Sequence, residues 1–166
     1  FPKELRNTVN DSKKLNKSKR EMCYRQLINH PSLIYHVGIG SVEEIDQLNI
    51  SQATKLAMSR AVQGLSITPN YVLIDGIRNP ELPYPTELII KGDQKSFSIA
   101  AASIIAKVYR DKIMADLHEM FPVFGWDKNA GYGTAAHRIG LEKYGITPHH
   151  RKSFKPVQAL QSQSII

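Results

Sequence analysis

Two aspartates stand at positions where the chain could hold a divalent cation. Asp75 follows the apolar run 71–74, Asp93 closely follows the apolar run 88–90, and each aspartate has a glycine beside it. Carboxylates at the ends of strands in an α/β sheet face the crevice where ligands usually bind. Hard oxygen donors without nearby Cys or His favour Mg²⁺ or Mn²⁺ over zinc, and these ions support phosphodiester hydrolysis. Asp before Gly is also common in plain turns, so the predicted metal site depends on both residues together.

A glycine-rich segment supplies a second kind of candidate chemistry. In Gly131-Tyr132-Gly133-Thr134, Thr134 is expected to cap a helix whose free N–H groups accept a phosphate, while Tyr132 stacks on a sugar or base. The alternative is a plain turn in which Tyr132 packs on the core. The segment also matches a loose G-x-G-x-x-A dinucleotide pattern, but no strand leads into it and no acidic residue follows at the required distance. We therefore exclude a Rossmann site.

The distribution of charge favours a polyanion as partner. The formal net charge is +7; residues 1–30 and 128–166 each sum to +5, whereas residues 31–127 sum to −3. Basic ends suit phosphate contacts and an acidic middle suits a divalent cation, a combination that favours a nucleic-acid enzyme over a plain binder. A generally basic surface without a specific partner is the alternative.

Three basic residues are the candidates for phosphate contact. Lys13 and Lys14 belong to one basic cluster near the N-terminal end, and Arg151 belongs to another that begins at His149-His150. Either cluster could instead be a solvated face, because charge runs usually are. We disfavour the two neighbouring histidines as a metal site, since adjacent side chains usually point apart.

Composition excludes several other classes of protein. The 166 residues are 42% apolar and 22% charged, which is ordinary for one globular domain. A single cysteine, Cys23, excludes an internal disulfide and a Cys-built zinc site, and fits a reducing compartment such as the cytoplasm. The longest apolar stretch, 99–108, is too short for a membrane span, which needs about 20 residues. No P-loop motif occurs, and Ser103 lacks the G-x-S-x-G elbow of serine hydrolases.

Periodicity and capping residues predict an α/β domain with a central sheet. Asp11 or Ser12 is expected to cap the first helix, and Ser41 with Glu44 to form the capping box of a second. The first half of the longest helix is apolar nearly all round and should be buried. In chain order we expect helix 17–29, strand 34–40, a helix from 41, helix 51–63, strands 71–74 and 88–90, helix 96–120 and helix 134–144.

A series of short stretches, taken together, resembles bacterial ribonuclease HII. Their order and spacing agree with that family from Asn10 to about Val157. The resemblance implies a ribonuclease H-like fold in a single domain over 1–166, with a mixed central sheet flanked by helices and a C-terminal helical extension, at about 128–160, that binds substrate. The matching stretches are 10–15, 44–50, 71–76, 91–93, 98–108, 110–111, 131–134 and 149–151.

The same resemblance implies an activity. The family cuts the RNA strand of RNA/DNA hybrids and cuts 5′ to single ribonucleotides embedded in duplex DNA. It uses Mg²⁺ or Mn²⁺ and leaves 3′-hydroxyl and 5′-phosphate ends. We further expect a monomer, with the Gln-rich tail Gln161–Ile166 as a candidate contact for a clamp protein.

Residue by residue, the resemblance assigns roles to the candidates already named. Asp75 and Asp93 match two of the family's four metal-binding carboxylates, and Tyr132 matches the tyrosine that stacks on the deoxyribose beyond the ribonucleotide. Lys13 and Lys14 fall in the family's phosphate-contacting segment. Independently of the resemblance, Asp111 lies among basic residues of the longest helix, where i,i+4 pairing is the ordinary explanation and a supporting role beside the metal site is the alternative.

One family motif does not occur in residues 1–166. The other two carboxylates belong to an Asp-Glu-x-Gly-Arg-Gly segment, whose glycines and arginine read the ribose 2′-hydroxyl. We expect this segment upstream of Phe1, within about one strand or hairpin. If it is absent, the alternative is a catalytically incomplete fragment that binds hybrid duplexes. A different ribonuclease H-like enzyme, such as a transposase or resolvase, is disfavoured by the detail of the match.

Overall fold

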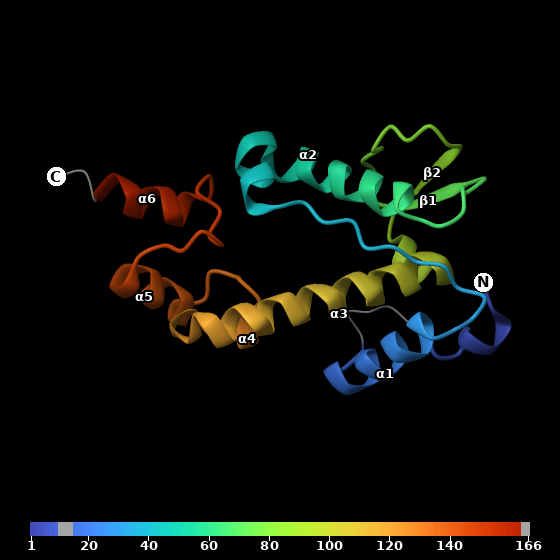
Figure 1. Ribbon diagram of the computed structural model, residues 1–166, viewed down its shortest axis with the longest axis horizontal. Helices are drawn as coiled ribbons and strands as arrows, with labels where there is room; N and C mark the ends of the chain where they lie inside the picture. Colours follow the sequence, from blue (N-terminus) through green and yellow to red (C-terminus); the bar gives the residue numbers. More distant parts are fainter. Residues whose placement is uncertain (10–14, 164–166) are drawn as a thin grey trace. The chain divides into compact units, whose positions relative to one another are not determined.

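A computed structural model of the chain describes residues 1–9 and 15–163, with side chains as far as residue 160. It divides into two compact units, each with its own apolar core. The first unit comprises Phe1–Ile39 with Lys55–Tyr109, and the second comprises Gly40–Thr54 with Arg110–Ile166. Each unit is therefore assembled from two separate stretches of chain (Figure 1). The expectation of one domain over 1–166 stays a prediction.

A parallel pair of strands forms the sheet of the first unit. Strand β1 (Val72–Asp75) pairs with β2 (Thr86–Ile89), with Val72 opposite Thr86 and Asp75 opposite Ile89. Val72 and Ile74 are buried on one side of β1, whereas Leu73 on the other side is only half-buried. The continuous apolar run predicts a strand buried on both faces, and β1 meets that prediction on one face. In the part of the chain that the structure describes, the expected mixed sheet is represented by these two parallel strands.

The core of the first unit lies between two helices. Helix α1 (Lys17–Ile28) contributes Cys23, Tyr24 and Leu27, and the first half of α3 (Phe97–Met120) contributes a stripe that includes Ile104, which is fully buried. The short helix η1 (Lys3–Leu5) adds Leu5 to the same cluster. The predicted burial of the first half of α3 is confirmed.

Helix α1 is capped differently from the prediction. Asp11 and Ser12 lie outside the described residues, and the structure shows Asn16 as the N-cap, whose side chain accepts a hydrogen bond from the Lys19 amide at 2.9 Å. The prediction of Asp11 or Ser12 as the cap is therefore wrong. Asparagine serves because its short side-chain oxygen reaches a free amide of the first turn.

Helix α2 (Val42–Gln63) is two helices joined at a kink, as the sequence predicts. Ser41 and Glu44 form the expected capping box, since each side chain accepts a hydrogen bond from the other residue's amide, at 2.8 and 3.2 Å. Asn49 breaks the helix with a φ of 67°. Its side-chain oxygen then accepts hydrogen bonds from the amides of Ser51 and Gln52, which restarts the helix.

The expected strand at 34–40 is wrong. The segment is extended but pairs with no strand among the described residues, and its end lies against α2. A Cβ atom at Gly38 would overlap the Ala57 carbonyl oxygen, so glycine allows an approach to the helix backbone that other residues would block. Arg60 Nη1 donates to the Ile39 carbonyl at 2.7 Å, which takes up a backbone acceptor that a neighbouring strand would otherwise bind.

Helices make up most of the second unit, in agreement with the expected C-terminal helical extension. Four elements follow α3 in the chain: η3 (Pro122–Phe124), α4 (Trp126–Asn129), α5 (Ala135–Tyr144) and α6 (Lys155–Gln163). Phe124, Trp126, Leu141 and Val157 form the buried cluster. Gly140 brings α5 close to η3, because a Cβ there would lie 2.7 Å from the Val123 carbonyl oxygen.

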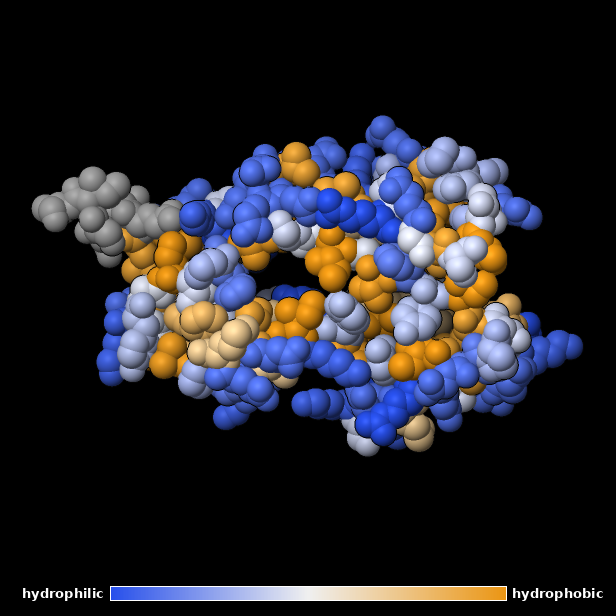
Figure 2. Space-filling view, in the orientation of Figure 1, coloured by the Kyte–Doolittle hydropathy of each residue, from blue (hydrophilic) through white to orange (hydrophobic). Residues whose placement is uncertain are grey.

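Apolar residues reach the surface in patches between hydrophilic ones (Figure 2). Several exposed apolar side chains lie in or next to the two strands, among them Tyr71, Ile77, Leu88 and Ile90. Within the described residues, no helix is long and apolar enough to cross a membrane.

Candidate functional site

The end of β1 and the turn after β2 bring the two predicted aspartates to one place in the first unit. Asp75 is exposed at the end of β1, and its Oδ1 atom accepts a hydrogen bond from the Gly92 amide at 2.8 Å. Gly92 is the residue directly before Asp93. Because the strands are parallel, their carboxyl ends meet at the same edge of the sheet, as expected for a ligand crevice in an α/β fold.

The turn that carries Asp93 has a conformation that limits its sequence. Lys91 adopts the left-handed region with a φ of 56°, after which η2 (Gly92–Gln94) begins. A Cβ at Gly92 would lie 2.5 Å from Ile99 Cδ1 and 3.4 Å from Asp75 Oδ1, so the turn packs closely against both α3 and the aspartate. Asp93 is 5% exposed. The two carboxylates thus differ in setting, one open to solvent and one enclosed.

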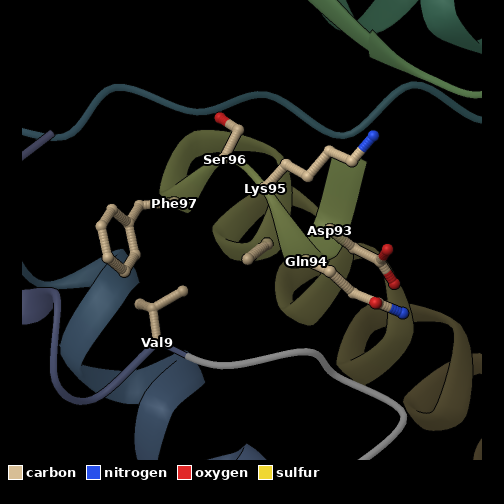
Figure 3. A pocket seen from close by; sticks show the side chains of 7 residues that line it. Val9, Asp93, Gln94, Lys95, Ser96 and Phe97 are labelled. Atoms are coloured by element: carbon tan, nitrogen blue, oxygen red, sulfur yellow. The ribbon is translucent and has the colours of Figure 1, made fainter. Parts of the chain in front are cut away.

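A cavity of about 100 Å³ adjoins Asp93 (Figure 3). Val9 and Phe97 form an apolar wall on one side, and the side chains of Asp93 and Gln94 extend away from that wall. Lys95 extends in a third direction. The buried carboxylate therefore lies next to a small cavity with one apolar and one polar side.

The donor set at this edge of the sheet fits a hard divalent cation. One oxygen of Asp75 is oriented by the Gly92 amide, and the exposed position of this residue at the end of β1 suits its carboxylate to coordination. Mg²⁺ is typically held by one or two carboxylates and completes its shell with water and phosphate oxygens. In the described part of the chain no group of three or more His, Cys, Asp or Glu residues could hold a metal, so this chain offers two carboxylates to such a site.

The glycine-rich loop of the second unit presents Tyr132 to solvent. Its side chain is 73% exposed, which contradicts the alternative of a Tyr packed on the core. Gly131 adopts a φ of 82°, and the Tyr132 amide donates to the Asn129 carbonyl at 2.8 Å. Thr134 caps α5 as predicted, with its hydroxyl accepting from the His137 amide at 3.3 Å.

A buried pair of histidines lies behind this loop. His137 and His150 are each 5% exposed, and their Nε2 atoms are 3.1 Å apart. His137 Nδ1 lies 3.0 Å from the Tyr132 carbonyl oxygen, and His150 Nδ1 lies 3.0 Å from both the amide and the hydroxyl of Thr147. Burial, together with the neighbouring His137, lowers the pKa of His150 to about 4. His149 is exposed whereas His150 is buried, and the ring centre of His149 lies 6.5 Å from that of Trp126.

Asp46 holds the basic segment that follows His150. Its two carboxylate oxygens accept hydrogen bonds from the amides of Lys152 and Ser153 at 2.8 and 2.9 Å, and from the Ser153 hydroxyl at 2.6 Å. Partial burial raises the pKa of Asp46, but these hydrogen bonds and the Lys152 charge outweigh that effect, so the pKa lies below 3.8. Arg151 is half-buried, with its guanidinium 5.0 Å from the centre of the Phe154 ring.

Comparison with known proteins identifies the family. The family described as Ribonuclease HII matches residues 3–157. The chain belongs to the ribonuclease HII family. It is 53% identical over 152 residues to the Ribonuclease HII of Macrococcus caseolyticus, covering 92% of this chain and 56% of that one, and 52% identical over 151 residues to Ribonuclease HII 1 of Methylibium petroleiphilum, covering 91% and 76%.

A solved structure confirms the predicted ribonuclease H-like α/β fold. The crystal structure of the ribonuclease H2 from Pyrococcus horikoshii OT3 has a TM-score of 0.83 and 25% sequence identity, covering 96% of this chain and 83% of that one. The chain spans about half of the Macrococcus caseolyticus ribonuclease HII and about three quarters of the Methylibium petroleiphilum protein.

The structure of this ribonuclease HII chain accounts for some of the predicted site residues and leaves others open. Asp75 and the turn that carries Asp93 are hydrogen-bonded in the first unit, whereas Tyr132, Thr134 and Arg151 belong to the second. Asp111 is half-buried on α3 in the second unit, and its supporting role stays a prediction. Lys13 and Lys14 lie outside the described residues, and so do the side chains of the tail Gln161–Ile166.

Several residues that support these candidates carry little signal in the sequence. In the sequence Gly92 stands out only as the neighbour of Asp93, and no local pattern indicates that its amide binds Asp75 seventeen positions earlier. Asp46 and its partners are more than 100 positions apart, and no local pattern links them. His137 and His150 are 13 positions apart, with a spacing that belongs to no metal motif.

Proposed function

We propose that this chain carries the catalytic and nucleic-acid-binding residues of an endoribonuclease. The enzyme cleaves the RNA strand of RNA/DNA hybrids and cuts 5′ to single ribonucleotides in duplex DNA. The reaction is a two-metal hydrolysis of a phosphodiester with Mg²⁺ or Mn²⁺, leaving 3′-hydroxyl and 5′-phosphate ends. Membership of the ribonuclease HII family supports the general activity.

One observation carries the proposal at the level of residues. The hydrogen bond from the Gly92 amide to Asp75 Oδ1 ties the end of β1 to the turn that carries Asp93. The carboxylate of Asp75 is thereby oriented at the edge of the sheet, beside the turn of η2 that carries Asp93. A pre-oriented carboxylate binds a cation at a lower entropic cost than a freely rotating one.

Each candidate residue has a defined task in this proposal. Asp75 and Asp93 hold the divalent cations, with Asp75 oriented by Gly92 and Asp93 enclosed beside the cavity. When bound, the cations activate a water molecule and stabilise the charge that develops on the leaving 3′-oxygen. Tyr132 stacks on the nucleic acid, because its exposed side chain offers an aromatic face to a base or sugar.

Phosphate contacts in the second unit complete the proposed substrate interface. The first turn of α5 presents backbone N–H groups beside Thr134, and Arg151 supplies a positive charge. Thr134 contributes by capping the helix, which fixes the direction of those N–H groups. Lys13 and Lys14 are proposed as further phosphate contacts on the strength of the family match alone.

Cleavage of a DNA duplex that contains one ribonucleotide tests the proposal. We compare the chain with Asp75→Asn and Asp93→Asn in Mg²⁺ and in Mn²⁺, and expect each variant to lose on the order of 100-fold or more in rate, because a charged ligand is replaced by a neutral one. Asp116→Asn is the matched control, because it makes the same change of charge at an exposed position of α3. Calorimetric titration with Mn²⁺ gives a second readout that does not require turnover.

The outcomes separate the two hypotheses about the chain. Cleavage and Mn²⁺ binding that both survive Asp75→Asn would refute the role of that carboxylate. The second outcome is that this chain binds the duplex without cutting it, whereas a longer version with the Asp-Glu-x-Gly-Arg-Gly segment does cut. That result would mean that residues 1–166 bind the substrate and supply only half of the metal ligands.

A further inference from the structure

The buried histidine pair of the second unit has only one arrangement of protons that satisfies every neighbour. The amide and the hydroxyl of Thr147 both approach His150 Nδ1 at 3.0 Å, and an amide can only donate, so Nδ1 carries no proton. The proton of neutral His150 is therefore on Nε2, and it is donated to His137 Nε2 at 3.1 Å.

The same reasoning fixes the second ring. Tyr132 contributes a carbonyl oxygen, which can only accept, so His137 Nδ1 carries a proton and donates it at 3.0 Å. His137 Nε2 is then the acceptor that the arrangement of His150 requires, and it also lies 3.4 Å from Trp126 Nε1, a pure donor. A chain of hydrogen bonds thus runs from Thr147 through both rings to the backbone of Tyr132.

The recipient of this chain is the loop of Tyr132, which other hydrogen bonds also hold. The Tyr132 amide donates to the Asn129 carbonyl at 2.8 Å, and Arg110 Nη2 donates to the Ala130 carbonyl at 2.9 Å. Gly133 has no heavy atom within 4 Å of the place where a Cβ would be, and Tyr132 is 73% exposed. The Tyr132 carbonyl accepts from His137 and, at 2.8 Å, from the Thr134 amide. The hydrogen bond from His137 therefore constrains, from a side chain, the peptide that follows the Tyr132 ring.

The other end of the chain reaches the basic segment. His150 directly precedes Arg151, and the next two residues are held by Asp46 through three hydrogen bonds. The backbone on one side of Arg151 is thus fixed by His150 and the backbone on the other side by Asp46. The pair therefore links the loop of Tyr132 with the segment of Arg151 inside one unit.

We propose that His137 and His150 are positioning residues, a buried neutral pair that fixes the Tyr132 loop against the Arg151 segment and so pre-organises both for contact with nucleic acid. This inference rests on the proposed function, in which Tyr132 stacks on the substrate. It adds two residues to that site that touch no substrate and act through a backbone carbonyl. The lowered pKa of His150 agrees with a neutral ring at physiological pH.

Two substitutions of the same residue separate positioning from simple packing. In His137→Asn the amide nitrogen lies near the place of Nδ1 and still donates to the Tyr132 carbonyl. In His137→Gln the amide group reaches the place of Nε2 and still meets His150, but the carbonyl loses this donor. Both variants replace the buried ring by a smaller neutral amide side chain. A packing defect should therefore affect both variants alike.

Binding is measured without cleavage, by fluorescence anisotropy of a labelled DNA duplex with one ribonucleotide in EDTA. Tyr132→Ala measures the full contribution of the ring to binding, and we expect it to raise Kd about 5- to 100-fold, as for a stacked base. We expect His137→Gln to lose most of that factor and His137→Asn to stay within about threefold of the unchanged chain. The double variant Tyr132→Ala/His137→Gln should bind no more weakly than Tyr132→Ala alone, because without the ring its position no longer matters.

The outcomes distinguish this inference from the function on which it rests. Equal losses for His137→Gln and His137→Asn, or additive losses in the double variant, would overturn the positioning role while leaving the stacking role of Tyr132 intact. An unchanged Kd for Tyr132→Ala would remove the stacking role itself. If the His137 variants do not fold, nitrogen-15 NMR of the unchanged chain measures which ring nitrogens carry protons. A protonated His150 Nδ1, or an unprotonated His137 Nδ1, would overturn the arrangement.

Discussion

Lowering the pH from 7 to 4.5 should reduce the free energy of unfolding through His150 in particular. The folded protein keeps this ring neutral, because burial and the neighbouring His137 lower its pKa from 6.5 to about 4. The unfolded chain binds a proton near pH 6.5, so between pH 6.5 and 4 it holds more protons than the folded protein does. Stability therefore falls as the pH falls through this window, and the loss levels off below pH 4.

The size of the effect follows from the two pKa values. Linkage between a folded value of about 4 and an unfolded value of 6.5 gives a loss of roughly 2 kcal/mol between pH 7 and pH 4.5. A loss of about 1 to 2 kcal/mol is a large share of the roughly 5 to 15 kcal/mol that holds an ordinary domain folded.

Urea unfolding of the chain and of His150→Gln, at pH 7 and at pH 4.5, measures the effect. Glutamine does not titrate, and its amide can still donate to His137, so the stability of the variant should depend less on pH by the stated amount. Carboxylates such as Asp46 titrate in both proteins and cancel in the comparison. Equal pH dependence in the two proteins, or an NMR titration of His150 with a midpoint near 6.5, would refute the reasoning.

Two further substitutions test packing and hydrogen bonding in separate units. Asp46→Ala should lower the free energy of unfolding by about 1 to 2 kcal/mol in urea, because the amides of Lys152 and Ser153 lose their acceptor, and the difference should shrink below pH 3.8 as the carboxylate is protonated. Gly38→Ala should cost about 2 to 3 kcal/mol, because the new Cβ would overlap the backbone of α2, whereas Gly133→Ala, with open space around it, should leave the thermal midpoint nearly unchanged.

Local sequence signals predict the elements of this fold well where they are self-contained. The capping box of Ser41 and Glu44, the Thr134 cap and the buried first half of α3 each depend on residues within a few positions. The strand expected at 34–40 fails because its apolar pattern is the same whether the segment pairs with a strand or packs on a helix. Gly38, which permits the close approach to α2, decides between the two.

The candidate site is predictable in its chemistry but not in its supporting contacts. Asp75 and Asp93 are recognisable because each follows a short apolar run, and parallel pairing of those runs is enough to bring them together. The partners of Asp46 and the pairing of His137 with His150 depend on how distant segments meet, which no periodicity encodes. Sequence reasoning therefore identifies the groups that act and misses the groups that orient them.

The hydrogen bonds of Asp46 set an order of events during synthesis. Its partner Ser153 follows 107 positions later in the chain. At about 5 to 20 residues per second, a ribosome needs about 5 to 20 s to reach that partner after Asp46 has been made. For all of this time the first helix of α2 lacks its counterpart, so these hydrogen bonds close the second unit only after residues 152 and 153 have left the ribosome.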